Sequence, residues 1–363
     1  MNTFPLSKSV SVLLLLFLLI GGLYFTREFA VPVAIAGLLS MLLVPLSRRF
    51  EKKGMNRAVA TLLCILVMLL VIAGIAALIA WQVSDLAQDT AKMQERIIKM
   101  GEQLRQYISK TLGISKEQQQ QMLEKQQSSA SDSAGTLVKA VLASLMSTLV
   151  NAVLVVVYIF LFMFFRGHLK KFILQLVSPG EKQKSEIIIN DVSKVSQKYL
   201  SGMGMMIVCL WIMYGIGYTI VGVKNAIFFA ILCGLLEIVP FVGNVTGTAI
   251  TLLMAVSQGG SSNMIIGILI TYGVVQFIQT YLLEPLVVGA EVNINPLFTI
   301  LVIIVGEMIW GIPGMILAIP ILGMVKIICD HVQPLKPFGF LIGEEKKAKE
   351  ESGVIKKIKG WFK

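Results

Sequence analysis

Long apolar runs separated by short polar stretches dominate this chain and predict membrane-spanning helices. Residues 29–46 and 58–81 have lengths typical of a transmembrane helix, which needs about 20 residues, and residues 10–24 form a shorter first run. Residues 137–165 and 203–221 supply a fourth and a fifth run. Because only helices and closed barrels satisfy their backbone groups in lipid, we predict an all-α polytopic membrane helix bundle.

The C-terminal half is equally apolar, but its runs are broken. Residues 226–239 and 245–256 are each too short for a comfortable crossing, so they predict either one broken span or a hairpin of two half-helices. Residues 264–283 form a full span, and residues 297–326 form another that is interrupted near Gly311. Broken or re-entrant helices survive in a bilayer only where protein or a wet cavity surrounds the break, which points to a transport site. The breaking residues are Pro240, Gly243, Pro285, Gly289, Pro296, Gly311, Pro313 and Gly314.

Residues 84–137 carry mixed charge and many Gln residues, which predicts a helical soluble insertion. Apolar residues within it follow the a/d spacing of a coiled coil for about two heptads. They form either the buried side of an amphipathic helix or a self-association seam between protomers. The seam consists of Met93, Ile97, Met100, Leu104 and Tyr107.

The composition agrees with a membrane protein: 56% of the 363 residues are hydrophobic and 15% are charged, whereas soluble domains carry about 25% charged residues. The net charge of +11 comes from Lys and Arg gathered between the apolar runs, around residues 48–57 and 166–198. Excess Lys and Arg mark cytoplasmic loops that face anionic lipid, so nucleic acid is not an expected partner. This pattern predicts cytoplasmic N- and C-termini.

The predicted order of segments follows from these patterns. It is membrane spans one to three (1–83), an extracytoplasmic helical insertion (84–137), the fourth span (138–165), a cytoplasmic basic interfacial helix (166–200), a transport core with interrupted helices (201–326) and a basic cytoplasmic tail (327–363).

Glu237 is the first candidate for chemistry, because it lies three residues before Pro240 in an otherwise apolar half-helix. An unpaired carboxylate at this depth is costly, so the group is protonated, paired or open to water. It serves either as a proton or cation site, or as a hydrogen-bond partner for backbone groups freed by Pro240.

Two polar stripes follow. Asn244, Thr248 and Thr251 lie on one face of the second half-helix, and Gln276 and Gln279 recur with similar spacing on the next span. Such stripes either line a hydrophilic path or form hydrogen bonds between helices. Further carboxylates occur at Glu284, in a predicted loop, and at Glu307, in the last span.

Several kinds of chemistry have no support in the sequence. It contains no G-x-x-x-x-G-K-[ST] phosphate loop, so coupling to nucleotide hydrolysis is not expected. The two histidines and four cysteines form no metal-ligand pattern, and no protease or hydrolase signature occurs. We expect no cofactor, no metal site and no enzymatic activity.

Three motifs carry a family resemblance: E-I-V-P-F-V-G-N at 237–244, Q-F-I-Q-T-Y-L-L-E-P-L-V-V-G-A-E-V-N-I-N-P at 276–296, and W-G-I-P-G-M-I-L-A-I-P at 310–320. With the order of spans, they resemble the autoinducer-2 exporter family of bacterial permeases. The resemblance implies a multi-pass protein of the bacterial cytoplasmic (inner) membrane that forms homo-oligomers, in known members pentamers. It implies export of small hydrophilic signals in some members and sodium/proton exchange in others.

This chain departs from the family pattern at two places. The family usually has Pro-Tyr-hydrophobic-Gly-Pro where this chain ends in Gly243-Asn244, and often Leu-His-Pro where it has Ile294-Asn295-Pro296. The missing histidine weakens any transfer of a proton-handling role to Asn295.

We therefore expect a transporter or permease that moves a small hydrophilic solute without nucleotide hydrolysis. A monovalent cation (sodium)/proton antiporter and a non-transporting scaffold that uses the insertion are the alternatives. The expected partners are the lipid bilayer, the solute or monovalent cation, and further copies of the chain. The expected pathway residues are Glu237, Asn244, Thr248, Gln276, Gln279, Glu284 and Glu307.

Overall fold

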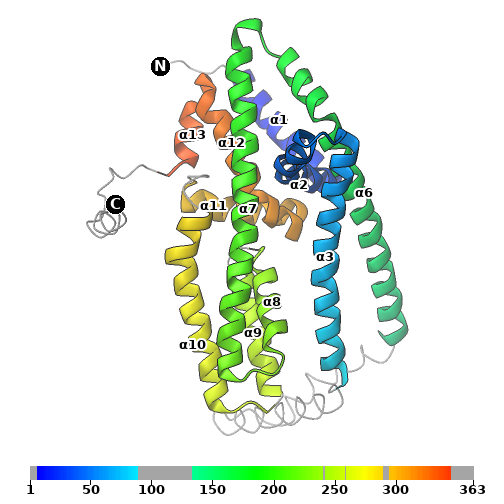
Figure 1. The fold of residues 1–363 in the computed structure, drawn as a ribbon. Coiled ribbons are helices and arrows are strands. Elements are labelled where there is room, and N and C mark those ends of the chain that lie inside the picture. The colour runs from blue at the N-terminus through cyan, green and yellow to red at the C-terminus, as the bar shows by residue number, and fades with distance from the viewer. Residues whose placement is uncertain (1–5, 89–132, 240–241, 258, 289–293, 345–363) are drawn as a thin grey trace, which may run out of the picture. The chain divides into compact units, whose positions relative to one another are not determined.

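A computed structural model describes residues 6–88, 133–239, 242–257, 259–288 and 294–344 (Figure 1). Its regular elements in these ranges are helices, and an isolated antiparallel bridge joins Ile294 to Gly343. Contacts divide the chain into two compact units. Unit 1 contains Met1–Leu169 and Leu200–Gly289, and unit 2 contains Lys170–Tyr199 and Ala290–Lys363.

The helices confirm the all-α polytopic class. Within the described ranges, 6 helices are long and apolar enough to cross a bilayer, judged by length and composition. They carry many exposed apolar side chains, such as Leu70 at 62% exposure, as expected of surfaces that face lipid. These helices are Arg27–Lys52, Arg57–Ala80, Asn151–Gln175, Pro179–Val221, Ser262–Glu284 and Ile312–His331.

Unit 1 begins with α1 (Leu6–Phe25) and α2 (Arg27–Lys52), which is followed by α3 (Arg57–Gln88). Gly54 has a φ of +90°, a left-handed value that glycine adopts without strain, so the chain turns there between α2 and α3. Helix α6 (Ser133–Gln175) comes next in the described chain. Its buried side chains pack with those of α2 and α3 in a core of Ala36, Cys64, Ile65, Ile159 and Met163.

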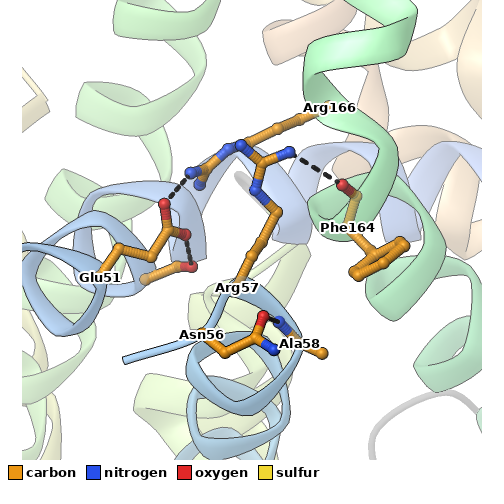
Figure 2. A network of polar contacts seen from close by, with 7 residues as sticks. Glu51, Asn56, Arg57, Ala58, Phe164 and Arg166 are labelled. Atoms are coloured by element: carbon orange, nitrogen blue, oxygen red, sulfur yellow. Dashed lines mark hydrogen bonds and ion pairs between the residues drawn. The ribbon is translucent and has the colours of Figure 1, made fainter. Parts of the chain in front are cut away.

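Polar contacts join α6 to the α2–α3 turn (Figure 2). Arg166 Nη2 donates to Glu51 Oε2 at 2.5 Å, and Ser47 Oγ donates to Glu51 Oε1 at 2.8 Å. Arg57 Nη1 donates to the carbonyl oxygen of Phe164 at 3.4 Å. The Glu51–Arg166 ion pair therefore connects segments more than a hundred residues apart, and each side chain is only about one-fifth exposed.

The remainder of unit 1 contains two packed half-helices. Helix α7 (Lys182–Val221) runs into unit 1 from unit 2, and α8 (Ala226–Leu236) and α9 (Val242–Ser257) follow. A Cβ on Gly247 of α9 would lie 2.9 Å from Cys233 of α8, so the two helices pack closely side by side. Residues 226–257 thus form a hairpin, one of the two arrangements that the sequence allowed.

Helix α10 (Ser262–Ile278) continues as a π-helical segment, Gln279–Val288. Glu284 and Pro285 were predicted in a loop, which is wrong, because both lie within this segment. Helix α7 is one continuous helix of 40 residues, so the basic segment expected at the interface continues directly into the fifth span.

Unit 2 contains α11 (Pro296–Trp310) and α12 (Ile312–His331). The break predicted near Gly311 is present, but its two sides do not form the single span expected over 297–326. The chain reverses at Gly311, where φ is +64°, and the helices fold back on each other. A Cβ on Gly306 would lie 3.2 Å from Cβ of Ala318, a contact that a continuous helix excludes.

A 3-10 turn (Gln333–Leu335) and a short helix, α13 (Lys336–Ile342), follow α12 in what was predicted to be a basic tail. The predicted coiled-coil seam, Met93, Ile97, Met100, Leu104 and Tyr107, lies outside the described residues and stays a prediction.

Candidate functional site

The turn between α8 and α9 positions the main candidate carboxyl group. Glu237 follows the last residue of α8, and its N–H donates to the carbonyl of Cys233 at 3.2 Å. On the other side of the turn, the N–H of Gly243 donates to the carbonyl of Val239 at 3.0 Å. A Cβ on Gly243 would collide with the carbonyl oxygen of Leu236, so this close reversal requires glycine.

Side chains from four helices form one buried polar network, which contains Tyr214, Glu237, Asn244, Gln276 and Gln279. The Tyr214 hydroxyl of α7 donates to Asn244 Oδ1 on α9, and Asn244 Nδ2 donates to Gln276 Oε1 on α10. Asn244 Nδ2 also lies 3.4 Å from Gln279 Oε1. Gln279 Nε2 in turn donates to Glu237 Oε1 at 2.7 Å.

Two oxygens of this region are buried without a hydrogen-bond partner in the described structure, Glu237 Oε2 and Thr248 Oγ1. The exposures of these two side chains are 7% and 4%, and Gln279 is only 1% exposed. Buried polar atoms are nearly always paired, because leaving one unpaired costs about 1–3 kcal/mol. Each open oxygen is thus a position where a water, a proton or a ligand would improve the local bonding.

The predicted polar stripes do meet. Asn244 of the first stripe bonds to Gln276 and Gln279 of the second, and Gln276 Nε2 reaches Thr280 Oγ1 at 3.1 Å. Thr251 is completely buried and donates to the carbonyl of Gly247 at 2.8 Å. The hydrogen bonding between helices that the sequence allowed is therefore present.

Two further predicted carboxyl groups differ in their relation to this network. Glu284 is exposed on the π-helical segment that extends α10, and it lies close enough to Gln279 and Glu237 to interact with both. Glu307 is exposed on α11 and belongs to unit 2, whereas the network belongs to unit 1. Pro240 and Gly289 lie outside the described residues.

The helix breaks predicted in unit 2 have distinct local roles. Asn295 caps α11 by accepting from the N–H of Leu297 at 2.9 Å, and Pro296 is the first residue of that helix. Pro313 lies in the first turn of α12. Gly314 is buried where its backbone meets that of Gly306.

Sequence reasoning missed Tyr214, which supplies the only donor to the network from α7 among the described contacts. The signal was present, because Tyr214 and Tyr218 recur at i and i+4 in an apolar, glycine-rich run. Both are almost fully buried, and buried tyrosine hydroxyls usually find a partner. The Tyr218 hydroxyl lies 3.6 Å from Cys233 Sγ.

Metal chemistry gains no support from the described residues, in which no group of three or more His, Cys, Asp or Glu residues could hold a metal ion. The network instead consists of neutral amides, a hydroxyl and one carboxyl group. Such groups exchange hydrogen bonds with one another, with water and with polyhydroxylated solutes.

Comparison with known proteins identifies the family of the chain. The family described as "AI-2E family transporter" matches residues 13–333, which is most of the chain. The chain belongs to this family. Membership confirms the resemblance seen in the sequence, and it identifies a multi-pass membrane protein of a transporter family.

Individual relatives are distant. The chain is 26% identical to YueF of Bacillus subtilis over 312 residues, which is 81% of this chain and 82% of YueF. It is 25% identical to PerM of Escherichia coli over 336 residues, 90% of this chain and 94% of PerM. Against YrrI of B. subtilis it is 24% identical and covers 46% of that protein. The names of these relatives propose transport or permease roles and give no substrate.

Proposed function

We propose that this AI-2E family member is a secondary transporter that exports a small hydrophilic solute, or facilitates its passage, without nucleotide hydrolysis. By family resemblance the solute is an autoinducer-2-like signal. The protein would work in the bacterial inner membrane as a homo-oligomer, of five copies by resemblance to known family members, with both termini in the cytoplasm.

The buried network in unit 1 carries this proposal. Asn244, Gln276 and Gln279 present neutral donors and acceptors at the centre of an apolar bundle, and Glu237 keeps one oxygen open. A hydroxyl-rich solute can replace amide–amide bonds with amide–hydroxyl bonds at little net cost in hydrogen bonds. The network therefore supplies hydrogen-bond donors and acceptors that replace those a solute loses when it leaves water.

The arrangement along α10 suggests a route to the network. Glu284 is exposed, and Gln279, five residues earlier, is fully buried and interacts with the Glu284 side chain. Gln276, three residues before Gln279, is half-buried. The π-helical segment places these side chains on an irregular helix, and π-segments recur at functional sites. Glu284 would meet a solute first, and the glycine-dependent turn at Gly243 would allow the hairpin to move.

A sodium/proton antiporter is the second candidate, and one observation favours it. Glu237 is a buried carboxyl group with an unpartnered oxygen, and an intramembrane carboxyl of this kind is suited to bind a proton or a monovalent cation. The exporter moves a solute across the membrane in each turnover, whereas the antiporter exchanges sodium for protons.

Proteoliposomes separate the candidates. We would measure uptake of labelled small polar solutes, and in parallel proton movement with a pH-sensitive dye under a sodium gradient. Solute flux without proton movement supports the exporter, and sodium-driven proton movement without solute flux supports the antiporter. If neither flux exceeds that of empty vesicles, while deletion of residues 84–137 abolishes the cellular phenotype, the scaffold alternative replaces both.

The Glu237→Gln variant tests the site itself. Gln retains an acceptor for Gln279 but cannot carry charge, so we expect flux to fall about tenfold or more, equivalent to at least about 1.4 kcal/mol in the barrier. Glu28→Gln, an exposed carboxyl change at the start of α2, is the matched control and should leave flux unchanged. Equal fluxes in both variants would exclude Glu237 from the pathway.

A further inference from the structure

The short helix α13 (Lys336–Ile342) exposes an unusually apolar surface. Phe338 is 57% exposed, Phe340 75% and Leu341 57%. Pro337 is exposed as well, and Lys336 is the only charged residue of the helix. A short surface helix in water normally presents polar residues on its outer side, so this face is suited to a different environment.

The opposite side of α13 is firmly attached to unit 2. Gly339 is buried against α12, where a Cβ would collide with the side chain of Asp330 and lie 3.1 Å from its backbone nitrogen. Asp330 is held in turn by Lys326, whose Nζ lies 2.6 Å from Asp330 Oδ2. The orientation of α13 relative to α12 is thus set by close packing, and its Phe residues cannot simply turn inward.

The position of α13 in the chain indicates what covers the apolar face. The candidate span α12 ends at His331, and a 3-10 turn separates it from Lys336. Five residues with a rise of about 2 Å each place the start of α13 within about 10 Å of the end of the span. The headgroup region extends roughly 5–8 Å beyond the hydrocarbon on each side, so α13 begins at this boundary.

Charge in unit 2 agrees with an anionic lipid surface. Lys182, Lys184 and Lys336 are exposed, while the Asp330 carboxylate is paired with Lys326. The acids next to α13 are the exposed but paired Asp330 and Glu344, which is exposed beyond the end of the helix. Lysine beside exposed Phe and Leu is the pattern of helices that lie in the membrane interface.

We propose that α13 is an interfacial anchor whose Phe338, Phe340 and Leu341 insert into the headgroup–acyl boundary of an anionic leaflet. The anchor is linked to the start of the α11–α12 hairpin. The N–H of Asn295, the cap of α11, donates to the carbonyl of Ile342 at 2.9 Å, and Ile294 pairs with Gly343. An anchor in the bilayer surface would therefore fix the position of Asn295, where the α11–α12 hairpin begins.

Spin-label accessibility in vesicles of phosphatidylcholine and phosphatidylglycerol tests the proposal. A nitroxide is attached to Phe340→Cys after the four native cysteines are replaced by alanine, and its relaxation by oxygen and by a water-soluble nickel chelate is compared. Leu70→Cys provides the lipid-facing reference, and Ser262→Cys, an exposed position at the polar start of α10, provides the aqueous one. We expect the oxygen-to-nickel ratio at position 340 to exceed that at 262 severalfold and to approach that at 70.

Other results would overturn the proposal in distinct ways. High nickel accessibility at position 340 means that the face lies in water, and low accessibility to both reagents means that protein covers it. A second measurement retains the native cysteines: Phe340→p-benzoylphenylalanine is irradiated in the same vesicles. Cross-links to lipid are expected, whereas a cross-linked dimer band would assign the face to a second copy of the chain.

Discussion

Asn244 shows how one side chain can organise several helices. Its carbonyl oxygen accepts from Tyr214 and its amide nitrogen bonds to Gln276 and Gln279, so α7, α9 and α10 meet at a single amide. Its exposure is only 4%, which means that water does not replace a lost partner easily. Each donor and acceptor in this network is therefore sensitive to conservative substitution.

Tyr214→Phe tests this sensitivity, because it removes one hydroxyl and leaves the ring in place. We expect the free energy of unfolding to fall by about 1 kcal/mol, since the Asn244 carbonyl loses a buried donor. The measurement is denaturant titration in mixed micelles. Tyr218→Phe is the control, because the Tyr218 hydroxyl lies against a weak sulfur acceptor, and a smaller loss is expected. Equal losses would show that the Tyr214 bond contributes nothing specific.

At the scale of elements, close backbone contact rather than side-chain interdigitation defines both hairpins. In α11 and α12, Gly306 and Gly314 bring two backbones together, and in α8 and α9 Gly247 lies against Cys233. Small residues allow this approach in membranes, where hydrophobic burial does not drive helices together. The hairpins consequently depend on a few glycines.

Gly314→Ala should destabilise the α11–α12 hairpin, because the new Cβ would collide with the carbonyl oxygen of Gly306. We expect a loss of about 1–3 kcal/mol in unfolding free energy, as for other overpacked sites. Gly204→Ala in α7 is the matched control, since nothing lies within 4 Å of its Cβ position. A neutral result at position 314 would contradict the close backbone contact.

The ion pair between Glu51 and Arg166 should contribute more than an exposed pair. A double-mutant cycle with Glu51→Gln and Arg166→Gln is expected to give a coupling energy of about 1–3 kcal/mol, because both groups are mostly removed from solvent. The same cycle at Lys170 and Glu186, which are 36% and 50% exposed, should give less than about 1 kcal/mol. Similar coupling at the two sites would mean that the α6 contact adds no stability.

For the whole molecule, the topology rests on the distribution of Lys and Arg. The basic stretches around residues 48–57 and 166–198 are both expected in the cytoplasm, and the insertion 84–137 outside it. Together with cytoplasmic termini, this arrangement would leave the anchor helix α13 on the cytoplasmic leaflet, where anionic lipids concentrate.

Thiol labelling of intact cells checks this topology. A membrane-impermeant maleimide should react with Ser128→Cys in the insertion and should not react with Lys53→Cys or Lys182→Cys until the cells are opened. Positions 53 and 182 are expected to behave alike, because both lie in basic stretches. Labelling of Lys53→Cys in intact cells would reverse the orientation of α2 and α3.

The amino-acid sequence alone determined the class of the protein, the positions of most helices and the faces that carry polar residues. Apolar runs predicted the helices and the membrane class, since each helix satisfies its own backbone groups within a continuous segment. Periodicity correctly placed Asn244 and Thr248 on one face, and Gln276 and Gln279 on another. The position of Glu237 before a break was likewise visible without a structure.

The tertiary structure alone decided how these segments pair. The reversal at Gly311 looks in the sequence like an interrupted span, because local hydrophobicity does not show the direction of the chain. The π-helical continuation after Ile278 likewise looks like a loop. Packing likewise selected Tyr214 as the partner of Asn244 and left Glu284 exposed. These outcomes depend on contacts between distant segments, and such contacts form only when helices approach closely enough to exclude lipid and water.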